Sequence, residues 1–418
     1  MSGFLEEAPK LTRSLQLFER AARVVPGGIY GHTSPIAALP GASPYFATRA
    51  EGCRYYDVDG NSYLDFMCGY GPIILGYHHP AVEEAATVQR ARGSVFNHPV
   101  EVMVELAEQL TNQIDFADWA VFAKNGSDVT TWAVQVARQA TGRRKILKVS
   151  GAYHGVDAWC TPGWGGVIEE DRTHVHSFAW NDLEAFQNLL SEHHEDVAAV
   201  VVTPYHHPSF AASVLPAPGF HQTIAQTCRK KGIVFILDDI RVGFRLHPGG
   251  SHRLFDFQPD IACYCKALGN GYPISAAAGR SSLKNAASKV FLTGSYWNNG
   301  EAQAAALTCL RILNQEDVPK RLELLGSRLS ERLTRSASDH GFTFHLTGPL
   351  AAPYPVFDND PNLHLIQEFC RLAIARGVFF HPHHNWFLSA AHNEEVIDEA
   401  CAIAEECFDL LHKSHSAK

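Results

Sequence analysis

The sequence predicts an α/β protein in which helices cover a large, mostly parallel β-sheet, together with a smaller α+β domain. The chain has 418 residues, which exceeds the usual limit for one hydrophobic core and favours two lobes around a cleft. Short continuous apolar runs, such as Ile233 to Leu237 and Ile261 to Cys265, are typical of strands buried on both faces. From about Val318 the pattern changes to a long polar helix, short strands and two further helices, which is typical of a second, smaller domain.

The composition is that of an ordinary globular protein. The formal net charge is −9 and there is no basic block, which argues against a nucleic acid or an anionic membrane as partner. No apolar run approaches the length of a membrane span, and the N-terminus lacks a basic start followed by an apolar core. We therefore expect a cytoplasmic protein. The ten cysteines are scattered without a CxxC pair, which favours buried free thiols over disulfides.

The N-terminal segment, residues 1–66, is expected to join the small domain. Its Leu and Phe spacing predicts an amphipathic helix near the start, and the Gly-, Pro- and Ser-rich stretch 24–46 predicts a loop. Two hairpin-like strands follow, with a turn at Asp59-Gly60. We place the large domain at residues 67–315 and the small C-terminal domain at 316–418.

A candidate phosphate site follows the predicted strand 119–123. Asn125, Gly126 and Ser127 end this strand and open a helical pattern, so free amide groups, a hydroxyl and the helix dipole would converge on a dianion. The same residues also suit a plain turn with a helix N-cap.

A carboxylate pair and a lysine follow two buried strands. Asp238 and Asp239 come directly after the first run, at the strand end where open α/β sheets place ligands, although a cap or turn would use such residues too. Lys266 directly follows the second run. Desolvation there lowers the pKa of a lysine, which favours the neutral amine that attacks an aldehyde. Pyridoxal phosphate (PLP) uses both a lysine and an acidic partner for its pyridine nitrogen, so the pair predicts a PLP site.

The segments LDDIRVGFR and PDIACYCKALGNGYPI resemble the Asp-Glu-Val…Gly-Phe-Arg and Lys…Gly-Gly-Gly-x-Pro segments of class III PLP-dependent aminotransferases, particularly their glutamate-1-semialdehyde aminomutase-like branch. The resemblance spans most of the chain in the correct order. It implies a fold-type I PLP-dependent transferase that forms a homodimer with shared active sites. By position it implies that Lys266 binds the cofactor covalently, that Asp238 holds the pyridine nitrogen and that Ile240 backs the ring.

Three further segments extend the resemblance. KNGSD matches the family's Ser-Gly-Thr-Glu-Ala, with aspartate in place of glutamate, and implies that Gly126 and Ser127 hold the phosphate. AYHGVDAW resembles Tyr-His-Gly, so Tyr153 would stack on the ring with His154 close behind. In VFLTGSYWNNG, Ser295 would reach the phosphate of the neighbouring subunit.

Departures from the family pattern bear on the substrate. Semialdehyde aminomutases carry an arginine after the first Pro-Gly-Gly that clamps a substrate carboxylate, and GGIYGHTSPIAAL has none. Thr203 replaces a glutamate found in most relatives, and His384 occupies the position of the acidic residue in the family's Phe-Glu-Ala-x-Phe segment. We therefore expect a donor amine with an extended, hydroxylated or apolar body, and the motifs most resemble those of the fumonisin (aminopentol) aminotransferases, which use pyruvate as acceptor. The expected pocket residues are Tyr30, His32, Tyr70, Trp297, His383 and His384. Simple packing explains Tyr70 equally well.

Several alternatives remain open. An aminomutase or a racemase would use the same cofactor, although the missing arginine argues against the mutase. A metal protein is suggested by 23 histidines, because His381 and His383 would point the same way on a strand, but no matching carboxylate or cysteine set accompanies them. Retention of Lys266 and Asp238 argues against a catalytically silent binding protein. Arg245 is a candidate for a structural ion pair in the first place. Binding of the keto-acid acceptor's carboxylate is the second option for it.

Overall fold

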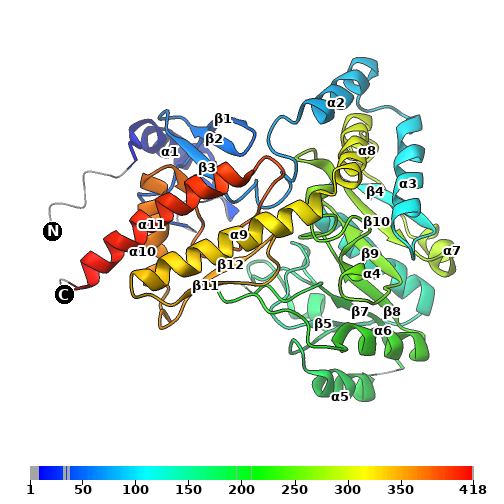
Figure 1. Cartoon of the computed structure of the whole chain (residues 1–418). Coiled ribbons are helices and arrows are strands. Elements are labelled where there is room, and N and C mark those ends of the chain that lie inside the picture. The colour runs from blue at the N-terminus through cyan, green and yellow to red at the C-terminus, as the bar shows by residue number, and fades with distance from the viewer. Residues whose placement is uncertain (1–8, 32–33, 35–37, 194, 209, 417–418) are drawn as a thin grey trace. The chain divides into compact units, whose positions relative to one another are not determined.

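The computed structural model describes residues 9–31, 34, 38–193, 195–208 and 210–416 (Figure 1). These residues form two compact units. The first contains the described residues within Met1–His79, Ser209–Ser213 and Arg321–Lys418, and the second contains those within Pro80–Pro208 and Val214–Lys320. The division expected from the sequence, after residues 66 and 315, stays a prediction about separate functional domains.

The second unit is built on a seven-stranded sheet with the order β4-β10-β9-β8-β7-β5-β6. Its strands are β4 (Trp119–Ala123), β5 (Lys145–Val149), β6 (Val175–Phe178), β7 (Val197–Val202), β8 (Val234–Asp238), β9 (Ile261–Tyr264) and β10 (Ser275–Gly279). Strands β6, β5, β7, β8 and β9 are mutually parallel, whereas β10 is antiparallel to both β9 and β4. Every residue of β7, β8, β9 and β10 is buried, as the continuous apolar runs predict.

Strand direction determines which chain segments meet at one edge of this sheet. Because β10 is antiparallel to both β4 and β9, β4 runs in the same direction as β9. Strand β8 is parallel to β9, so β4, β8 and β9 all end at the same edge. Asp238 is the last residue of β8, and the segments that follow β4 and β9 begin at residues 124 and 265 and contain the predicted phosphate and lysine groups. The predicted cofactor residues are therefore brought to one edge by topology.

Helices cover this sheet in the second unit (Figure 1). They are α2 (Pro80–Arg92), α3 (Glu101–Gln113), α4 (Gly126–Thr141), α5 (Leu183–His193), α6 (Phe220–Lys231), α7 (Lys284–Ala287) and α8 (Gly300–Gln315). Helix α4 contacts five strands, β4, β7, β8, β9 and β10, and its Val129 and Ala133 are fully buried in the core between helix and sheet. This packing holds the first turn of α4 in place at the sheet edge.

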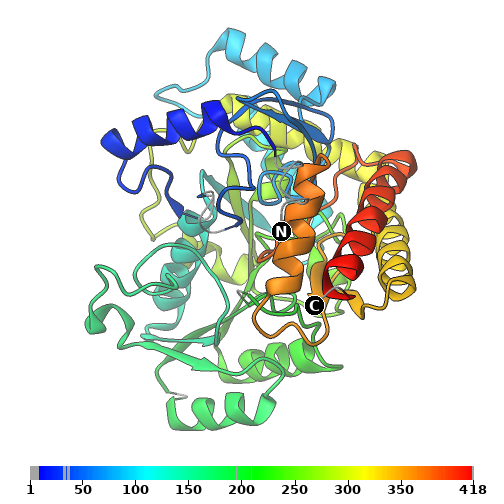
Figure 2. The same cartoon turned by 90° about the vertical axis from the view of Figure 1, so that its left-hand side faces the viewer.

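The first unit contains a four-stranded sheet with the order β1-β2-β3-β13 and a two-stranded hairpin. Its strands are β1 (Ala47–Glu51), β2 (Arg54–Asp57), β3 (Ser62–Asp65), β11 (Phe344–Thr347), β12 (Tyr354–Phe357) and β13 (Val378–Phe379). Its helices are α1 (Thr12–Val24), α10 (His364–Ala375), α11 (Glu394–Ser416) and most of α9 (Val318–Asp339). Helices α10 and α11 lie side by side (Figure 2), and the Phe369 and Phe408 rings stack between them at 4.8 Å.

The elements near the two ends of the chain follow the sequence pattern to different degrees. The C-terminal helices and the strands at FTFHLTG and PYPVFDN are confirmed. Near the N-terminus, the expectation of two strands is wrong, because three are present. Gly52, with a φ of +57°, makes an extra turn between β1 and β2, and Asp59-Gly60 turns β2 into β3 as predicted. All ten cysteines are free, and nine are buried.

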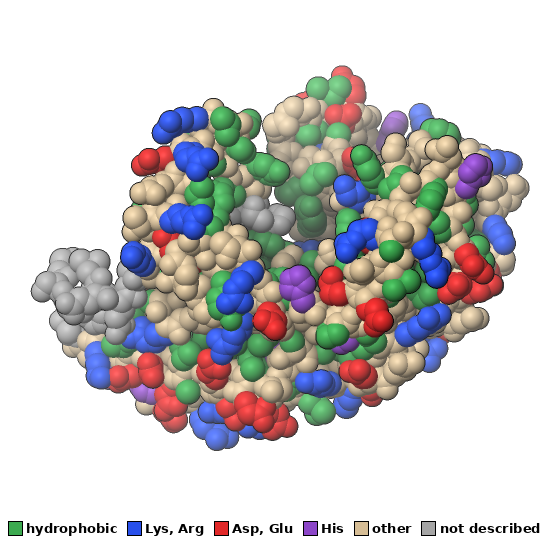
Figure 3. Space-filling model, turned by 90° about the horizontal axis from the view of Figure 1, so that it is seen from above, with side chains coloured by type: hydrophobic (Ala, Val, Ile, Leu, Met, Phe, Trp, Pro, Cys, Tyr) green, Lys and Arg blue, Asp and Glu red, His purple; other side chains and the backbone are tan. Residues whose placement is uncertain are grey.

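The surface carries charges of both signs. Figure 3 shows Lys and Arg side chains interspersed with Asp and Glu over the face in view, in line with the mixed charge pattern of the sequence. Within the described part of the chain, no helix has the length and hydropathy needed to cross a bilayer.

Candidate active site

A cavity of about 340 Å³ lies in the second unit, at the sheet edge where β4, β8 and β9 end. Residues from five separate parts of the chain line it. They are Asn125, Gly126, Ser127, Tyr153, His154, Gly155, Val156, Thr203, His207, Asp238, Ile240, Arg241, Cys265 and Lys266. The cavity thus gathers the candidate lysine, carboxylate, phosphate and ring-stacking residues.

The phosphate side of the cavity is the first turn of α4. Gly126 opens the helix, and its first amide groups have no acceptor within the helix. The Asp128 carboxylate accepts hydrogen bonds from the backbone nitrogens of Asn125, at 2.7 Å, and Lys124, at 3.2 Å. This segment therefore both caps the helix and lines the cavity. Aspartate at this position closes the turn.

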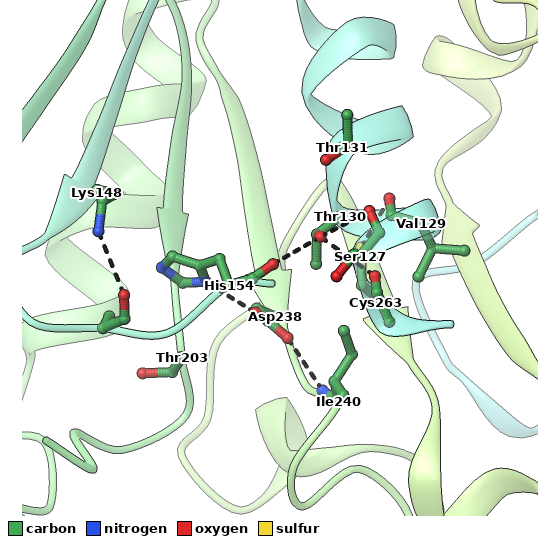
Figure 4. Close-up of polar contacts among 12 residues, drawn as sticks. Ser127, Val129, Thr130, Thr131, Lys148, His154, Thr203, Asp238, Ile240 and Cys263 are labelled. Atoms are coloured by element: carbon green, nitrogen blue, oxygen red, sulfur yellow. Dashed lines mark hydrogen bonds and ion pairs between the residues drawn. The ribbon is translucent and has the colours of Figure 1, made fainter. Parts of the chain in front are cut away.

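The loop after β5 is tied to α4 by two hydrogen bonds. The Val156 backbone nitrogen donates to Ser127 Oγ at 3.1 Å. Thr130 Oγ1 donates to the His154 carbonyl oxygen at 2.8 Å (Figure 4). Between them lies Gly155, with a φ of +130°, where an added Cβ would lie 2.5 Å from Ser127 Oγ. Only glycine allows this approach of the loop to Ser127.

We expect Gly155→Ala to weaken binding of a phosphate-bearing cofactor such as PLP by about tenfold or more, because strain of about 1–3 kcal/mol would displace Ser127. Titration of cofactor-free protein with PLP measures this. Gly163→Ala is the matched control, since a Cβ there meets no atom within 4 Å. Equal PLP affinities of the two variants would contradict the role of the loop.

The carboxylate side of the cavity centres on Asp238. His154 Nδ1 donates to Asp238 Oδ2 at 2.8 Å, and the Ile240 backbone nitrogen donates to Oδ1 at 3.2 Å (Figure 4). The His154 ring is in turn stacked on Trp159, with ring centroids 6.2 Å apart. Hydrogen bonds to both oxygens fix the orientation of the Asp238 carboxylate toward the cavity.

Asp239 faces away from the cavity. It is fully buried, and its carboxylate accepts hydrogen bonds from the backbone nitrogen and the hydroxyl of Ser251, at 2.8 and 2.6 Å. Burial raises the pKa of Asp239 to about 7, against the lowering effect of these hydrogen bonds. Successive residues of an extended chain point to opposite sides. The structural interpretation of the Asp-Asp pair therefore applies to Asp239 and the cavity interpretation to Asp238.

Lys266 begins a short 3-10 helix, Lys266–Gly269, and has a φ of +47°, which is uncommon for a residue with a side chain. Burial, and after it the Arg241 guanidinium, lower the pKa of Lys266 to about 8, against the raising effects of Cys265 and Asp238. A much larger fraction of this amine is neutral near pH 8 than of an exposed lysine. The site thus favours the nucleophilic form that the sequence predicts.

The rate at which Lys266 of cofactor-free protein reacts with an added aldehyde, such as pyridoxal, is expected to rise with pH and to level off above about pH 8. The lowered pKa is the reason, since only the neutral amine attacks. Stopped-flow absorbance across pH 6–11 measures the profile, and Lys266→Ala supplies the background from other lysines. A midpoint at the ordinary lysine value would refute the shift.

Some predicted residues lie elsewhere. Ser295 is exposed and does not line this cavity, and Trp297 lines a separate cavity of about 290 Å³ in the same unit. Tyr30, Tyr70 and the histidines of HPHH belong to the first unit, where Tyr30 is largely exposed. His32 lies outside the described residues.

The histidines His381, His383 and His384 form an aromatic cluster in the first unit. The Tyr70 ring lies 5.3 Å from that of His384, and the His383 backbone nitrogen donates to His381 Nδ1 at 3.1 Å. Over the residues that the structure describes, no group of three or more His, Cys, Asp or Glu side chains is arranged to hold a metal ion. The metal alternative therefore gains no support from these histidines.

Sequence reasoning missed several lining residues, chiefly Arg241, His207 and Cys265. Arg241 and Cys265 each lie within three residues of a predicted site residue, and that proximity was the available signal. His207 had none, because the loop after β7 lacks a recognisable motif.

The lining residues fit PLP. A lysine amine, a carboxylate and a helix N-terminus with a hydroxyl face one cavity. The first turn of α4 packs closely against Ile240, the side chain predicted to back the ring. A Cβ at Gly126 would lie 2.7 Å from Ile240 Cδ1, so only glycine fits at this point of the cavity wall.

Comparison with known proteins gives consistent matches. The family model described as aminotransferase class-III matches residues 37–409. Aminopentol aminotransferase of Sphingopyxis macrogoltabida is 39% identical over 400 residues, covering 96% of this chain and 94% of the relative. Glutamate-1-semialdehyde 2,1-aminomutase of Bordetella avium (strain 197N) is 33% identical, covering 96% of this chain and 100% of the relative. The FumI protein of Sphingopyxis sp. MTA144, solved with PLP, superposes with a TM-score of 0.95 at 38% identity, covering 97% of this chain and 98% of that one.

Proposed function

The chain belongs to the class-III aminotransferase family, and we propose that it transfers the amino group of an extended amine without an adjacent carboxylate, such as an amino-polyol, to a keto acid, with pyruvate as the acceptor. It is a PLP-dependent aminotransferase of fold type I, as the sequence predicted. The observation that carries the proposal is the placement of Lys266, Asp238 and Ser127 around one cavity.

Several residues of the cavity are proposed to have defined tasks. Lys266 holds the cofactor covalently, and Gly126 and Ser127 bind its phosphate at the start of α4. Tyr153 and Ile240 lie against the ring, while Asp238 keeps the pyridine nitrogen protonated.

PLP, when bound, supplies an electron-accepting ring. Lys266 removes the proton from the donor carbon that bears nitrogen and returns a proton afterwards, as a general base and acid. His154 is a positioning residue, because it acts through its hydrogen bond to Asp238.

The donor class is proposed from what the chain lacks. No arginine stands in residues 27–39, and the family resemblance implies that Thr203 and His384 occupy positions where the family pattern has acidic residues. Thr203 Oγ1 donates to the Tyr205 carbonyl oxygen at 2.8 Å, so this side chain serves its own loop. The similarity to an enzyme named for aminopentol supports an amine of that kind.

A homodimer with shared active sites is part of the proposal. Ser295 is exposed and lies outside the cavity of its own unit, which agrees with a hydroxyl that serves the phosphate of a neighbouring subunit. The expectation from the sequence that Trp297, Tyr30, His32, Tyr70, His383 and His384 serve the amine substrate stays a prediction.

An aminomutase is the second candidate, because an enzyme of that name is 33% identical over nearly the whole chain. An aminomutase returns the amino group to the same carbon skeleton and needs no separate keto acid. A requirement for pyruvate distinguishes the two reactions.

Absorbance spectroscopy of the purified protein tests the proposal. A long-chain 2-amino-polyol, added without a keto acid, should remove the yellow PLP band and give the pyridoxamine form, and pyruvate should restore the band. Lys266→Ala is the control and should not convert. Conversion by alanine but not by the amino-polyol would retain the cofactor and reject the donor class, and rearrangement of glutamate-1-semialdehyde without pyruvate would favour the mutase.

A further inference from the structure

The His154 imidazole reaches Asp238 through one ring nitrogen, so its orientation depends on what holds the rest of the ring. Nδ1 donates to Asp238 Oδ2 at 2.8 Å, and among the described residues Nε2 has no hydrogen-bond partner. The side chain is fully buried. A single hydrogen bond tolerates a range of angles, so the plane of the imidazole needs a second support.

Trp159 supplies that support. Its indole ring is nearly parallel to the His154 imidazole, with an interplanar angle of 9° and ring centroids 6.2 Å apart. An offset parallel arrangement is one of the favourable geometries for a pair of aromatic rings. Trp159 also packs against the buried core between α4 and the sheet. The core therefore holds the indole, and the indole limits the tilt of the imidazole beside it.

A chain of two hydrogen bonds fixes the indole itself. Trp159 Nε1 donates to Thr131 Oγ1 at 2.8 Å, and Thr131 Oγ1 donates to Asp157 Oδ2 at 2.5 Å. The direction of both bonds is determined, because an indole N–H only donates and an ionised carboxylate only accepts. The single proton of the hydroxyl is therefore committed to Asp157, and its oxygen accepts from Trp159.

The turn that carries Trp159 is braced by further hydrogen bonds. The Asp157 carbonyl oxygen accepts from the backbone nitrogens of Cys160 and Thr161, at 2.9 and 2.8 Å. The Arg172 guanidinium donates to the Thr161 carbonyl oxygen at 2.6 Å. The turn is thus held at its start and at its end, which gives the indole a fixed base.

Helix α4 connects this arrangement to the phosphate side of the cavity. Thr130 Oγ1 donates to the His154 carbonyl oxygen at 2.8 Å, and Thr131 is the next residue of the helix (Figure 4). Both threonines lie about one helical turn after Ser127. The backbone of His154 and, through Trp159, its side chain are therefore held by adjacent residues of α4.

We propose that Trp159 is a positioning residue of the aminotransferase reaction, which fixes the plane of the His154 imidazole beside Asp238. The hydrogen bonds with Thr131 and Asp157 hold its indole in place for this purpose. This inference rests on the proposed function, because it concerns the carboxylate assigned there to the pyridine nitrogen. Trp159 is not among the residues that line the described cavity, so its effect reaches the cofactor through His154 and Asp238.

The test uses the PLP-loaded variants Trp159→Leu and Trp159→Phe. Trp159→Leu should lower the rate of the half-reaction with the donor amine by about three- to tenfold, which corresponds to the loss of one aromatic pair, and should leave the KM of the amine within about twofold. The pH midpoint of the cofactor absorbance should move by about half a unit to one unit. Trp159→Phe keeps a ring beside His154 and should fall between.

Replacement of His154 distinguishes positioning from a merely structural role. In a His154→Ala background, Trp159→Leu should have no further effect on the rate or on the pH midpoint, because the group through which Trp159 acts is gone. Thr131→Val removes the hydroxyl that accepts from the indole and should reproduce part of the effect. Trp180→Leu is the matched control and should change neither quantity, because the Trp180 indole is also nearly parallel to a histidine ring, that of His206, at 5.6 Å and 17°, and neither residue lines the cavity.

Two results would overturn the inference. One is an unchanged rate and pH midpoint in a folded Trp159→Leu variant. The other is an equal loss from Trp159→Leu with and without His154, which would assign Trp159 to the stability of the fold alone. If Trp159→Leu does not fold, Trp159→Phe and Thr131→Val provide the same comparison. The pH titration needs no donor amine, so it still tests Trp159 if the amino-polyol proves to be the wrong donor.

Discussion

Lys266→Ala is expected to lower the transamination rate by at least about 10³- to 10⁴-fold, because it removes both the covalent attachment point and the group that moves the proton. The yellow band of the lysine-bound cofactor should also be lost. Half-reaction kinetics with the donor amine and absorbance spectra of the purified variant measure both effects.

The variant should remain folded. Lysine and alanine both carry a Cβ, so the substitution adds no backbone strain at the φ of +47°. Circular dichroism and thermal unfolding check this point. Lys284→Ala, at an exposed lysine of α7, is the matched control and should behave like the wild type. Transamination by Lys266→Ala at a wild-type rate would rule out Lys266 as the proton-moving group.

Asp238→Asn is expected to give the second largest loss, about 10²- to 10³-fold in kcat. The carboxylate and a protonated pyridine nitrogen at about 4 Å would attract each other by up to about 4 kcal/mol at an effective dielectric near 20, and an amide lacks this charge. Single-turnover kinetics with the donor amine measure the loss. Tight cofactor binding with slow chemistry is the expected combination.

Asp239→Asn provides the contrast within the same dipeptide. Its side chain points away from the cavity to Ser251, so we expect rates within about threefold of the wild type and a loss of stability of about 1–3 kcal/mol from weakened buried hydrogen bonds. Denaturant unfolding and steady-state kinetics of the two variants are compared. If Asp239→Asn slowed the chemistry as much as Asp238→Asn, the division of tasks between the two aspartates would be wrong.

The stability loss of Asp239→Asn should depend on pH. The pKa of Asp239 is raised to about 7 in the folded protein from an ordinary value of 3.8. A raised folded-state pKa gives a stabilisation that is fully present below the unfolded-state value and lost as pH rises through about 7. The stability difference between wild type and Asp239→Asn should therefore be larger at pH 5 than at pH 8. Unfolding curves at both pH values measure it, and a constant difference would show that Asp239 does not titrate in this window.

Much of the large domain could be predicted from the sequence alone. The apolar runs that end at Leu237 and Cys265 are long enough for one strand each and too apolar for a half-exposed one, so both strands and their covered sheet followed from the pattern. Resemblance to a family then identified which side chains at those strand ends serve the cofactor. The strand count near the N-terminus was not predicted correctly, because a turn at Gly52, with a positive φ, divides one expected strand into β1 and β2.

Contacts between distant parts of the chain were decided by the tertiary structure. His154 and Asp238 are 84 positions apart, and only the parallel arrangement of the intervening strands brings the imidazole within 2.8 Å of the carboxylate. The entry of Arg241 into the cavity depends in the same way on how the chain turns after β8. Local sequence determined the strands, the α4 turn and the chemical types present, because these depend on neighbouring residues. Which groups share one cavity depended on strand order and packing, because those bring together residues that no local pattern connects.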